Sequence, residues 1–394
     1  MEIINGKIFT MADQVYDRGF VLTDQEKIVA VGDMKDYEVC LGRIEPDMRN
    51  RVQKKKIALD GDWVLPGFIE AHCHVGIIEE KRGTMGDDCN EGTEPVTPHL
   101  RALDAVNPLD PAFHNALAAG ITAVMTGPGS SNVVGGQFLF MKTYGRNIDE
   151  MKMLEPAAMK VAFGENPKCN FGNQNKMPST RMAVAGMLRE ELFQAEQYRK
   201  NTSAEALEFR KEAWMPVFEK KIPIKAHAHR ADDILTAIRI AQEFDLDITL
   251  DHCTEGHLIA ESIAESGFPA IVGPSLTARS KIEVENMDFK TVGILHRAGV
   301  LTAVTTDHPV TLIETLPLCA GLAVKHGLPM EEGLKAITIY PAKICRVEHR
   351  VGSLEPGKDA DIAIFDGNPM EVFTNTLFTI INGAVVYERD LRCL

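Results

Sequence analysis

Apolar residues in this chain gather in short runs rich in β-branched side chains, and helical patterns stand between most of these runs. Eight such runs have the length of strands. They cover residues 63–74, 121–128, 136–143, 157–164, 222–229, 247–253, 269–275 and 301–307. Strands that alternate with helices form parallel sheets, and eight such units close into a barrel. We therefore predict an α/β fold with a (β/α)8 TIM barrel over residues 59–345.

The two ends of the chain have a different pattern. Residues 1–58 and 346–394 both show short alternating strand-like segments around Asn-Gly and Asp-Gly turn signals. Because the termini of compact domains often lie close together, we predict that these two segments pair into one small composite β-sandwich domain. The segment of about 180–220 is charged and mostly helical. We expect it to extend a crossover over the mouth of the barrel, with a detached arm as the alternative.

Charge and composition narrow the class of partner. The 394 residues include 42 Lys and Arg against 56 Asp and Glu, for a formal net charge of −14, and no basic stripe occurs. Nucleic acid and anionic membranes are therefore disfavoured. No window approaches the roughly 18 uninterrupted apolar residues of a membrane helix, and the start has no signal-peptide pattern, which predicts a cytoplasmic protein. The eight cysteines are scattered without a CxxC pair and are expected to be reduced.

Polar residues stand at the C-terminal ends of five predicted strands, the end at which barrel enzymes carry their active sites. The first strand ends in His72 and His74, and the fifth ends in His227 and His229. Two residues at i and i+2 on a strand share one face, so each pair can share a metal ion. One such pair is a weak signal, because core histidines bonded to the backbone are common. Two pairs at strand ends of one barrel are a stronger one.

The other three strand ends add carboxylates, imidazoles and an amine. They carry Asp251-His252, Asp307-His308, and Lys160 with Glu165 just beyond it. Neutral imidazoles with a carboxylate suit Zn²⁺, and also Fe, Mn, Co or Ni. A divalent metal lowers the pKa of bound water from about 15.7 towards 7, and a strand-end aspartate can take the proton. We therefore predict a catalytic metal site, with Asp307 best placed as the base.

With these residues the sequence resembles the amidohydrolase superfamily, and within it the imidazolonepropionase-related and prolidase-like enzymes. The resemblance runs nearly end to end and includes the VLPGFIE lead-in at 64–70 and the GSLEPGKDAD stretch at 352–361. It implies one or two divalent metal ions. By this resemblance His72 and His74 bind the more buried ion, His227 and His252 bind the second, and Asp307 contacts the first while serving as base.

The resemblance also implies a bridging carboxylate. In binuclear branches of the superfamily a lysine of the fourth strand is carboxylated and bridges the two metals, and Lys160 stands in the matching position. Glu165 is the alternative bridge, and we favour Lys160. On the fifth strand we favour His227 as the ligand, which leaves His229 to hydrogen-bond the substrate or the hydroxide.

Three further residues are candidates for substrate binding. We expect His308 to hold a substrate carbonyl or carboxylate. Arg279, in the loop after the seventh strand, is either an anion clamp or part of a surface salt bridge. Asn166, which follows Glu165, is the third candidate.

The sequence thus predicts a metal-dependent hydrolase that cleaves a C–N bond in a small cyclic amide, amide or dipeptide-like substrate. Asp307 acts as general base on metal-activated water, without a covalent enzyme intermediate. Deamination of an aminated heterocycle is the alternative. Deaminases of this kind pair the fifth-strand histidine with a glutamate three residues on. Arg230 follows His227 at that spacing, although Asp232 follows His229.

A third reading is a non-catalytic barrel scaffold, of the kind that some superfamily relatives form. The presence of every expected ligand makes it the least favoured reading. A homo-oligomer is an open expectation that rests only on the commonness of symmetric dimers.

Overall fold

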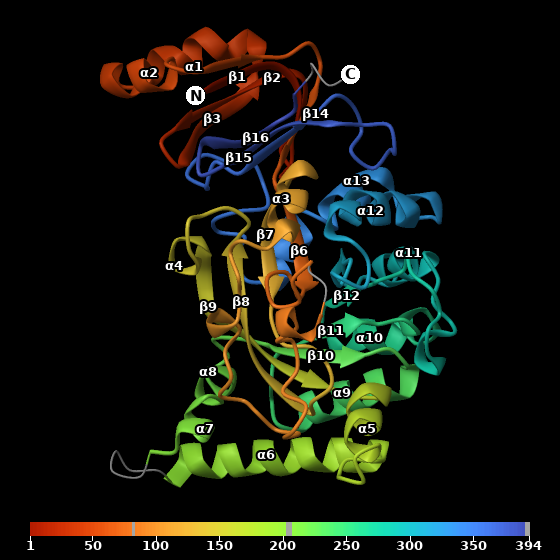
Figure 1. Ribbon diagram of the computed structural model, residues 1–394. Helices are drawn as coiled ribbons and strands as arrows, with labels where there is room; N and C mark the ends of the chain where they lie inside the picture. Colours follow the sequence, from red (N-terminus) through yellow and green to blue (C-terminus); the bar gives the residue numbers. More distant parts are fainter. Residues whose placement is uncertain (81–82, 202–206, 391–394) are drawn as a thin grey trace.

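The computed structural model describes residues 1–80, 83–201 and 207–390 and contains two sheets of eight strands each (Figure 1). Seven of the predicted apolar runs and the second part of the run 63–74 form one of these sheets, in which neighbours in the chain are also neighbours in space. Its strands are β6 (Phe68–Cys73), β7 (Ile121–Thr126), β8 (Val134–Lys142), β9 (Lys152–Ala162), β10 (Ile224–Ala228), β11 (Ile248–His252), β12 (Ala270–Val272) and β13 (Thr302–Val304). The hydroxyl of Thr305 donates to the carbonyl of His72 at 2.7 Å, so the first and last strands meet and the barrel is nearly closed.

One strand departs from the predicted pattern. β8 runs antiparallel to both β7 and β9, whereas the other neighbouring pairs of this sheet are parallel. Only residues 127–133 separate β7 from β8, and residues 143–151 before β9 hold only the short helix α4 (Ile148–Met151). A parallel crossover needs a dozen residues or more, so the chain turns back instead. The barrel is therefore TIM-barrel-like, and the prediction of a uniform (β/α)8 barrel was wrong at this strand.

The predicted strand 63–74 is two strands that belong to different sheets. Gly67 separates β5 (Trp63–Pro66), in the sheet of the chain ends, from β6 in the barrel. The N–H of Gly67 donates to the carbonyl of Asp361 at 2.9 Å. A Cβ atom on Gly67 would lie 2.1 Å from the hydroxyl oxygen of Thr122. The chain can pass from one sheet to the other here only because no side chain occupies that space.

Replacing Gly67 with Ala should therefore destabilise the protein by about 1–3 kcal/mol, the usual cost of overpacking. The shift of the urea unfolding midpoint measures this change. Gly42→Ala is the matched control, because Gly42 lies in a helix and a Cβ there would meet no described heavy atom within 4 Å. The control should leave stability unchanged or raise it by about 1 kcal/mol. A Gly67→Ala protein as stable as the wild type would contradict this account.

Both ends of the chain build the second sheet, in the order β16-β15-β14-β5-β1-β2-β3 with β4 beside β1. Its remaining strands are β1 (Glu2–Phe9), β2 (Val15–Asp24), β3 (Lys27–Asp33), β4 (Lys56–Ala58), β14 (Ile362–Phe365), β15 (Thr376–Ile381) and β16 (Ala384–Glu388). Pairing of β5 with β14 joins the strands of both chain ends into one hydrogen-bonded sheet. β5 also lies beyond the boundary that we predicted at residue 58.

Helices cover both sheets. α1 (Tyr37–Arg43) and α2 (Pro46–Val52) pack on the sheet of the chain ends, where Tyr37 and Leu41 join Phe20 in a separate apolar core. The other helices are α3 (Pro111–Ala118), α5 (Glu165–Gly172), α6 (Arg181–Asn201), α7 (Phe209–Glu212), α8 (Met215–Phe218), α9 (Ala231–Glu243), α10 (Ala260–Ser266), α11 (Lys290–Arg297), α12 (Leu316–Lys325), α13 (Met330–Lys335) and α14 (Ile339–Ile344).

The charged segment of about 180–220 is part of the body of the molecule. It forms α6, α7 and α8, and α6 lies at the end of the molecule farthest from the sheet of the chain ends (Figure 1). Val184, Leu188 and Leu192 of α6 are buried in the main apolar core, so this helix is no detached arm. Residues 202–206 of the segment lie outside the described residues.

Two further expectations meet the structure here. In the described residues, no helix combines the length and the apolar character that a membrane crossing requires. The seven described cysteines are unpaired, and Cys393 lies outside the described residues.

A buried cluster of charges joins the two sheets. Lys142, at the end of β8, is 3% exposed; it contacts Asp361 and lies 3.0 Å from Asp359. Asp359 also pairs with Lys27 at 2.7 Å and Arg350 at 2.8 Å. Burial opposes the ionisation of Asp359, but Lys142 and the other cations outweigh it and lower its pKa to about 2. The GSLEPGKDAD stretch, which contains both carboxylates, therefore holds the chain ends against the barrel.

Candidate metal centre

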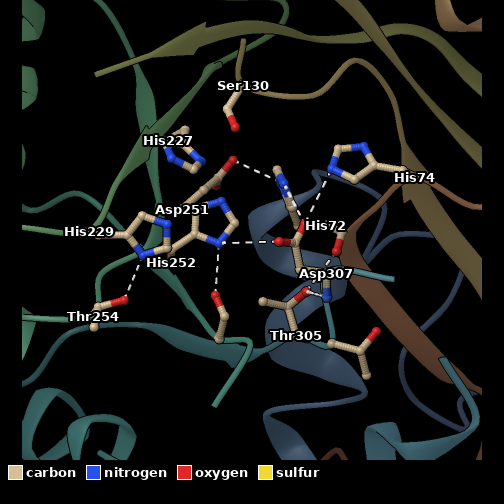
Figure 2. Close-up of polar contacts among 12 residues, drawn as sticks. His72, His74, Ser130, His227, His229, Asp251, His252, Thr254, Thr305 and Asp307 are labelled. Carbon is tan, nitrogen blue, oxygen red and sulfur yellow. Dashed lines mark hydrogen bonds and ion pairs between the residues drawn. The ribbon is translucent and has the colours of Figure 1, made fainter. Parts of the chain in front are cut away.

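Six ligand-type side chains converge where the barrel strands end (Figure 2). They are His72 of β6 with His74 just after it, His227 of β10 with His229 just after it, His252 of β11, and Asp307 just after β13. Ligand atoms of His72, His252 and Asp307 lie within 4.8 Å of one another, and so do those of His227, His229 and His252. The structure thus brings together the residues that period-two spacing and strand ends singled out.

Two imidazoles, that of His72 in the first group and that of His74 beside it, point at one oxygen of the Asp307 carboxylate. The Nδ1 atom of His74 lies 2.7 Å from the carbonyl of Gly127, which turns its Nε2 towards Asp307 at 3.3 Å. The Nε2 atom of His72 lies 3.5 Å from the same Oδ1 of Asp307. Among the described residues, this oxygen is buried without a hydrogen-bond partner. Two imidazoles and a carboxylate that point at one another suit one divalent ion.

The second group has the same construction. Nδ1 of His252 lies 2.8 Å from the carbonyl of Gly273, and Nδ1 of His229 lies 2.7 Å from the hydroxyl of Thr254. In both imidazoles a contact fixes Nδ1, and Nε2 is left to bind a metal ion. Nδ1 of His227 is buried with no hydrogen-bond partner in the described part of the chain. His227 and His229 both belong to this group, so the group does not decide which of them is the metal ligand.

The protonation states of four of the five imidazoles fit a metal ion. At His74 burial opposes the charged form, but Cys89 and Asp307 outweigh it and raise the pKa to about 10. Burial lowers the pKa of His72, His227, His229 and His252 well below the usual value of an imidazole, so each offers a lone pair at neutral pH. Burial opposes the ionisation of Asp307, but His252 and His74 outweigh it and lower the pKa of this carboxyl group. Neutral imidazoles, a carboxylate and buried atoms without partners together form a donor set for Zn²⁺ or a similar ion.

Backbone strain marks the same strand ends. His252, Cys253 and Asp307 adopt positive φ angles of 75°, 45° and 53°. Such angles are unfavourable for residues with a side chain and persist where the surrounding structure holds them. Here they turn two candidate ligands towards the centre of the barrel mouth.

The two candidate bridges lie at different places. Lys160 is fully buried, its Nζ atom lies 3.3 Å from Nε2 of His72, and burial lowers its pKa to about 8. Glu165 is the first residue of α5, and its backbone N–H donates to Glu283 at 2.9 Å. Within the described residues, the side chain of Glu165 belongs to neither ligand group. Lys160 is therefore the better positioned of the two.

A cavity of about 380 Å³ opens onto this centre, and His74, His227, His229 and Asp307 are part of its lining. Asn166 also lines it, with its amide Nδ2 donating to Ser130 at 2.7 Å. Arg279 does not: its guanidinium donates to the backbone carbonyls of Glu285 and Met287 at 2.9 and 2.7 Å. It holds its own loop together.

His308 is not among the residues that line this cavity either. It is fully buried, its Nδ1 accepts from the N–H of Ile313 at 3.1 Å, and its Nε2 lies 3.8 Å from Glu80. Burial lowers its pKa to about 4. These contacts give His308 a role in holding the loop after β13.

Sequence reasoning missed two charged residues near the centre, of which Lys281 lines the cavity. Lys281 lies 2.9 Å from Oδ1 of Asn166 and 2.6 Å from Glu283. Glu283 is buried, and its Oε1 lies 3.7 Å from Nε2 of His229 and 3.9 Å from Nε2 of His227. Both follow β12 in the loop that also contains Arg279. The sequence shows only that this loop contains many charged residues. It does not show which of them point towards the cavity.

A family model described as the amidohydrolase family matches residues 63–387, which include every candidate ligand. The chain belongs to the amidohydrolase family. The crystal structure of an amidohydrolase from Thermotoga maritima MSB8 matches this amidohydrolase with a TM-score of 0.91 and 39% identity, over 98% of this chain and 100% of that one.

Two curated relatives refine this membership. An imidazolonepropionase from Rhizorhabdus wittichii is 23% identical over 92% of both chains. The amidohydrolase tasK from Hapsidospora irregularis is 26% identical over 371 residues, and the match spans 37% of that protein's length. The protein is thus an imidazolonepropionase-related amidohydrolase, a hydrolase that acts on carbon–nitrogen bonds.

Proposed function

We propose that this amidohydrolase is a metal-dependent enzyme that cleaves a C–N bond in a small cyclic amide, amide or dipeptide-like substrate. The observation that carries the proposal is the convergence of five imidazoles and Asp307 beside one cavity at the strand ends. In this proposal His72, His74 and Asp307 hold one ion, and His227 and His252 hold the second. A bound divalent ion lowers the pKa of water towards about 7 and polarises the scissile carbonyl.

The residues of the chain supply the proton transfers and the orientation of the substrate. The Asp307 carboxylate lines the cavity, so it can accept a proton from the attacking water and return it to the leaving nitrogen. When the hydroxyl of Thr254 donates to Nδ1 of His229, the imidazole proton lies on Nε2, which can then donate to the substrate carbonyl. Ser130 and Lys281 orient the Asn166 amide for a polar contact with the substrate. Arg279 and His308 have no role here, because neither of them lines the cavity.

Deamination stays the second candidate because of Glu283. The sequence alternative relied on Asp232, but this side chain pairs with Arg230 at 2.9 Å and both are partly exposed. Glu283, in contrast, is buried beside both histidines of β10 and could move protons there. A purified enzyme that releases ammonia from aminated heterocycles, and loses this activity in Glu283→Gln, would favour deamination over amide hydrolysis.

The test of the proposed metal centre is the metal content of protein purified without chelators. Elemental analysis should find about one or two equivalents of a divalent metal per chain, and His72→Ala should lose most of it because one ligand is gone. His114→Ala is the control, since His114 is an exposed residue of α3 far from the ligand groups in the sequence. Active wild-type protein without metal would refute the proposed mechanism.

Two variants separate the candidate bridges. If CO₂ adds to the amine of Lys160 with loss of a proton, the resulting carbamate supplies the bridging carboxylate. Lys160→Ala should then drop from about two metal equivalents to one, and added acetate or propionate should restore part of the activity. Glu165→Ala should keep the wild-type metal content. The reverse result, with metal loss and rescue only in Glu165→Ala, would assign the bridge to Glu165.

A further inference from the structure

Two buried charged residues of the barrel have no part in the metal ligation proposed above. Lys225 on β10 is 1% exposed, and Asp251 on β11 is fully buried directly before His252. Removing two charges from water is costly, and their mutual attraction often does no more than repay that cost. A gain in stability is therefore a weak explanation for the presence of this buried pair. Its other contacts indicate what else it does.

One carboxylate oxygen of Asp251 is fully occupied. Its Oδ1 lies 3.2 Å from Nζ of Lys225 and accepts from the hydroxyl of Thr249 at 2.9 Å. Lys225 is itself anchored, because its Nζ also donates to the carbonyl of Ala71 at 3.1 Å. These contacts fix the plane of the carboxylate and leave Oδ2 to point elsewhere.

The second oxygen points at a candidate ligand. Oδ2 of Asp251 lies 2.9 Å from Nδ1 of His72, and both side chains are fully buried. The approach lacks the direction of a hydrogen bond, so neither buried atom has a hydrogen-bond partner within the described residues, and the distance alone links them. Figure 2 shows Asp251 beside the imidazole of His72, whose other side faces Asp307. The contact crosses from β11 to β6, so it joins strands that are not neighbours in the sheet.

We infer that Asp251 is a positioning residue that holds His72 in the tautomer with its proton on Nδ1, and that Lys225 is the counter-ion of Asp251. The inference rests on the proposed metal centre. A carboxylate oxygen carries only lone pairs, so at 2.9 Å it attracts a proton on Nδ1 of a neutral His72 and repels a lone pair there. The lone pair of Nε2 then faces Asp307 and the space for the ion. The opposite tautomer would bring two lone pairs together at 2.9 Å and would turn an N–H towards the metal.

Asp251→Asn tests this assignment with almost no change of size. With Lys225 and Thr249 on its oxygen, the Asn amide turns its NH₂ group towards His72, which favours the proton on Nε2. We expect the affinity for Zn²⁺ to fall by about 10- to 100-fold. Lys225→Met keeps the carboxylate that faces His72, so its Zn²⁺ affinity should stay within about threefold of wild type although the fold loses stability.

The experiment has two readouts besides activity. Chelator-stripped protein is titrated with Zn²⁺ in competition with a chromogenic chelator, and ¹⁵N shifts of labelled histidine report the tautomer of His72 in the metal-free protein. Asp110→Asn is the control, because Asp110 is also buried but accepts from the backbone N–H groups of Gly76, Glu80 and Ala112 and from no candidate ligand among the described residues. It should keep both the Zn²⁺ affinity and the His72 signal of the wild type.

The outcomes separate this inference from the proposed function. A wild-type His72 with its proton on Nε2 would overturn the inference even if Asp251→Asn failed to fold. An Asp251→Asn protein with wild-type Zn²⁺ affinity and an unchanged His72 signal would also overturn it. Wild-type protein that binds no Zn²⁺ but shows the Nδ1 proton, lost in Asp251→Asn, would refute the proposed metal centre and still support the positioning role.

Discussion

Asp307→Asn should lower kcat by about 10²- to 10⁴-fold, the usual contribution of a general base. The amide keeps an oxygen for the ion but cannot accept a proton from the attacking water. The folded structure should persist, because Asp307 Oδ1 makes no other hydrogen bond among the described residues. The measurement is kcat for an amide or dipeptide that the wild type hydrolyses, together with metal content.

Asp245→Asn provides the matched control, because this carboxylate is exposed and pairs with Lys220 at the surface. Its kcat should equal that of the wild type. Two results would argue against the assigned role of Asp307. Unchanged turnover would show that another group accepts the proton, and loss of most of the metal would mean that Asp307 acts mainly as a ligand.

Lys142→Met should lower the free energy of unfolding by about 3–5 kcal/mol, the usual cost of removing one partner from a buried ion pair. Asp361 would lose its described cation, while Asp359 would keep Lys27 and Arg350. Denaturant unfolding followed by circular dichroism measures the change. The expected loss of stability is large because Lys142 is buried and is the residue that links the barrel to the carboxylates of this cluster.

The double variant Lys142→Met/Asp361→Asn should recover part of the lost stability, because it removes the uncompensated charge as well. Lys152→Met is the control. It breaks a pair with Asp149 at 2.6 Å, but both side chains are largely exposed, and we expect a change below about 1 kcal/mol. Equal effects of Lys142→Met and Lys152→Met would show that the buried cluster contributes no more than a surface pair.

Most of the barrel could be predicted from the sequence, because its strands are continuous apolar runs of strand length. The direction of β8 was missed although the signal was present. The seven residues 127–133 are too few for a parallel crossover, and the sequence alone provides that count. The division of 63–74 into two strands was harder to see. It depends on Thr122, which lies 55 positions further along the chain and reaches Gly67 only in the folded protein.

The candidate ligands could be predicted for a similar reason. Residues two apart on a strand must share a face, so His72 with His74 and His227 with His229 follow from local geometry. Asp251 stood out as a strand-end carboxylate, but its contact with His72 crosses the barrel and has no local signature. The loop after β12 illustrates the limit. Arg279 and Lys281 are two positions apart, and only the path of the loop decides which of them reaches the cavity.

The pairing of β5 with β14 has a consequence for synthesis of the chain. Every candidate ligand precedes residue 308, but the edge of β5 meets its partner only when residues 362–365 are made, about 300 residues after β5 itself. At about 5–20 residues per second, a ribosome needs roughly 15–60 s for that interval. During it the nascent protein carries an unpaired strand edge, the feature on which chains aggregate. A chaperone that covers this edge would therefore matter most after the barrel is complete and before the last strands emerge.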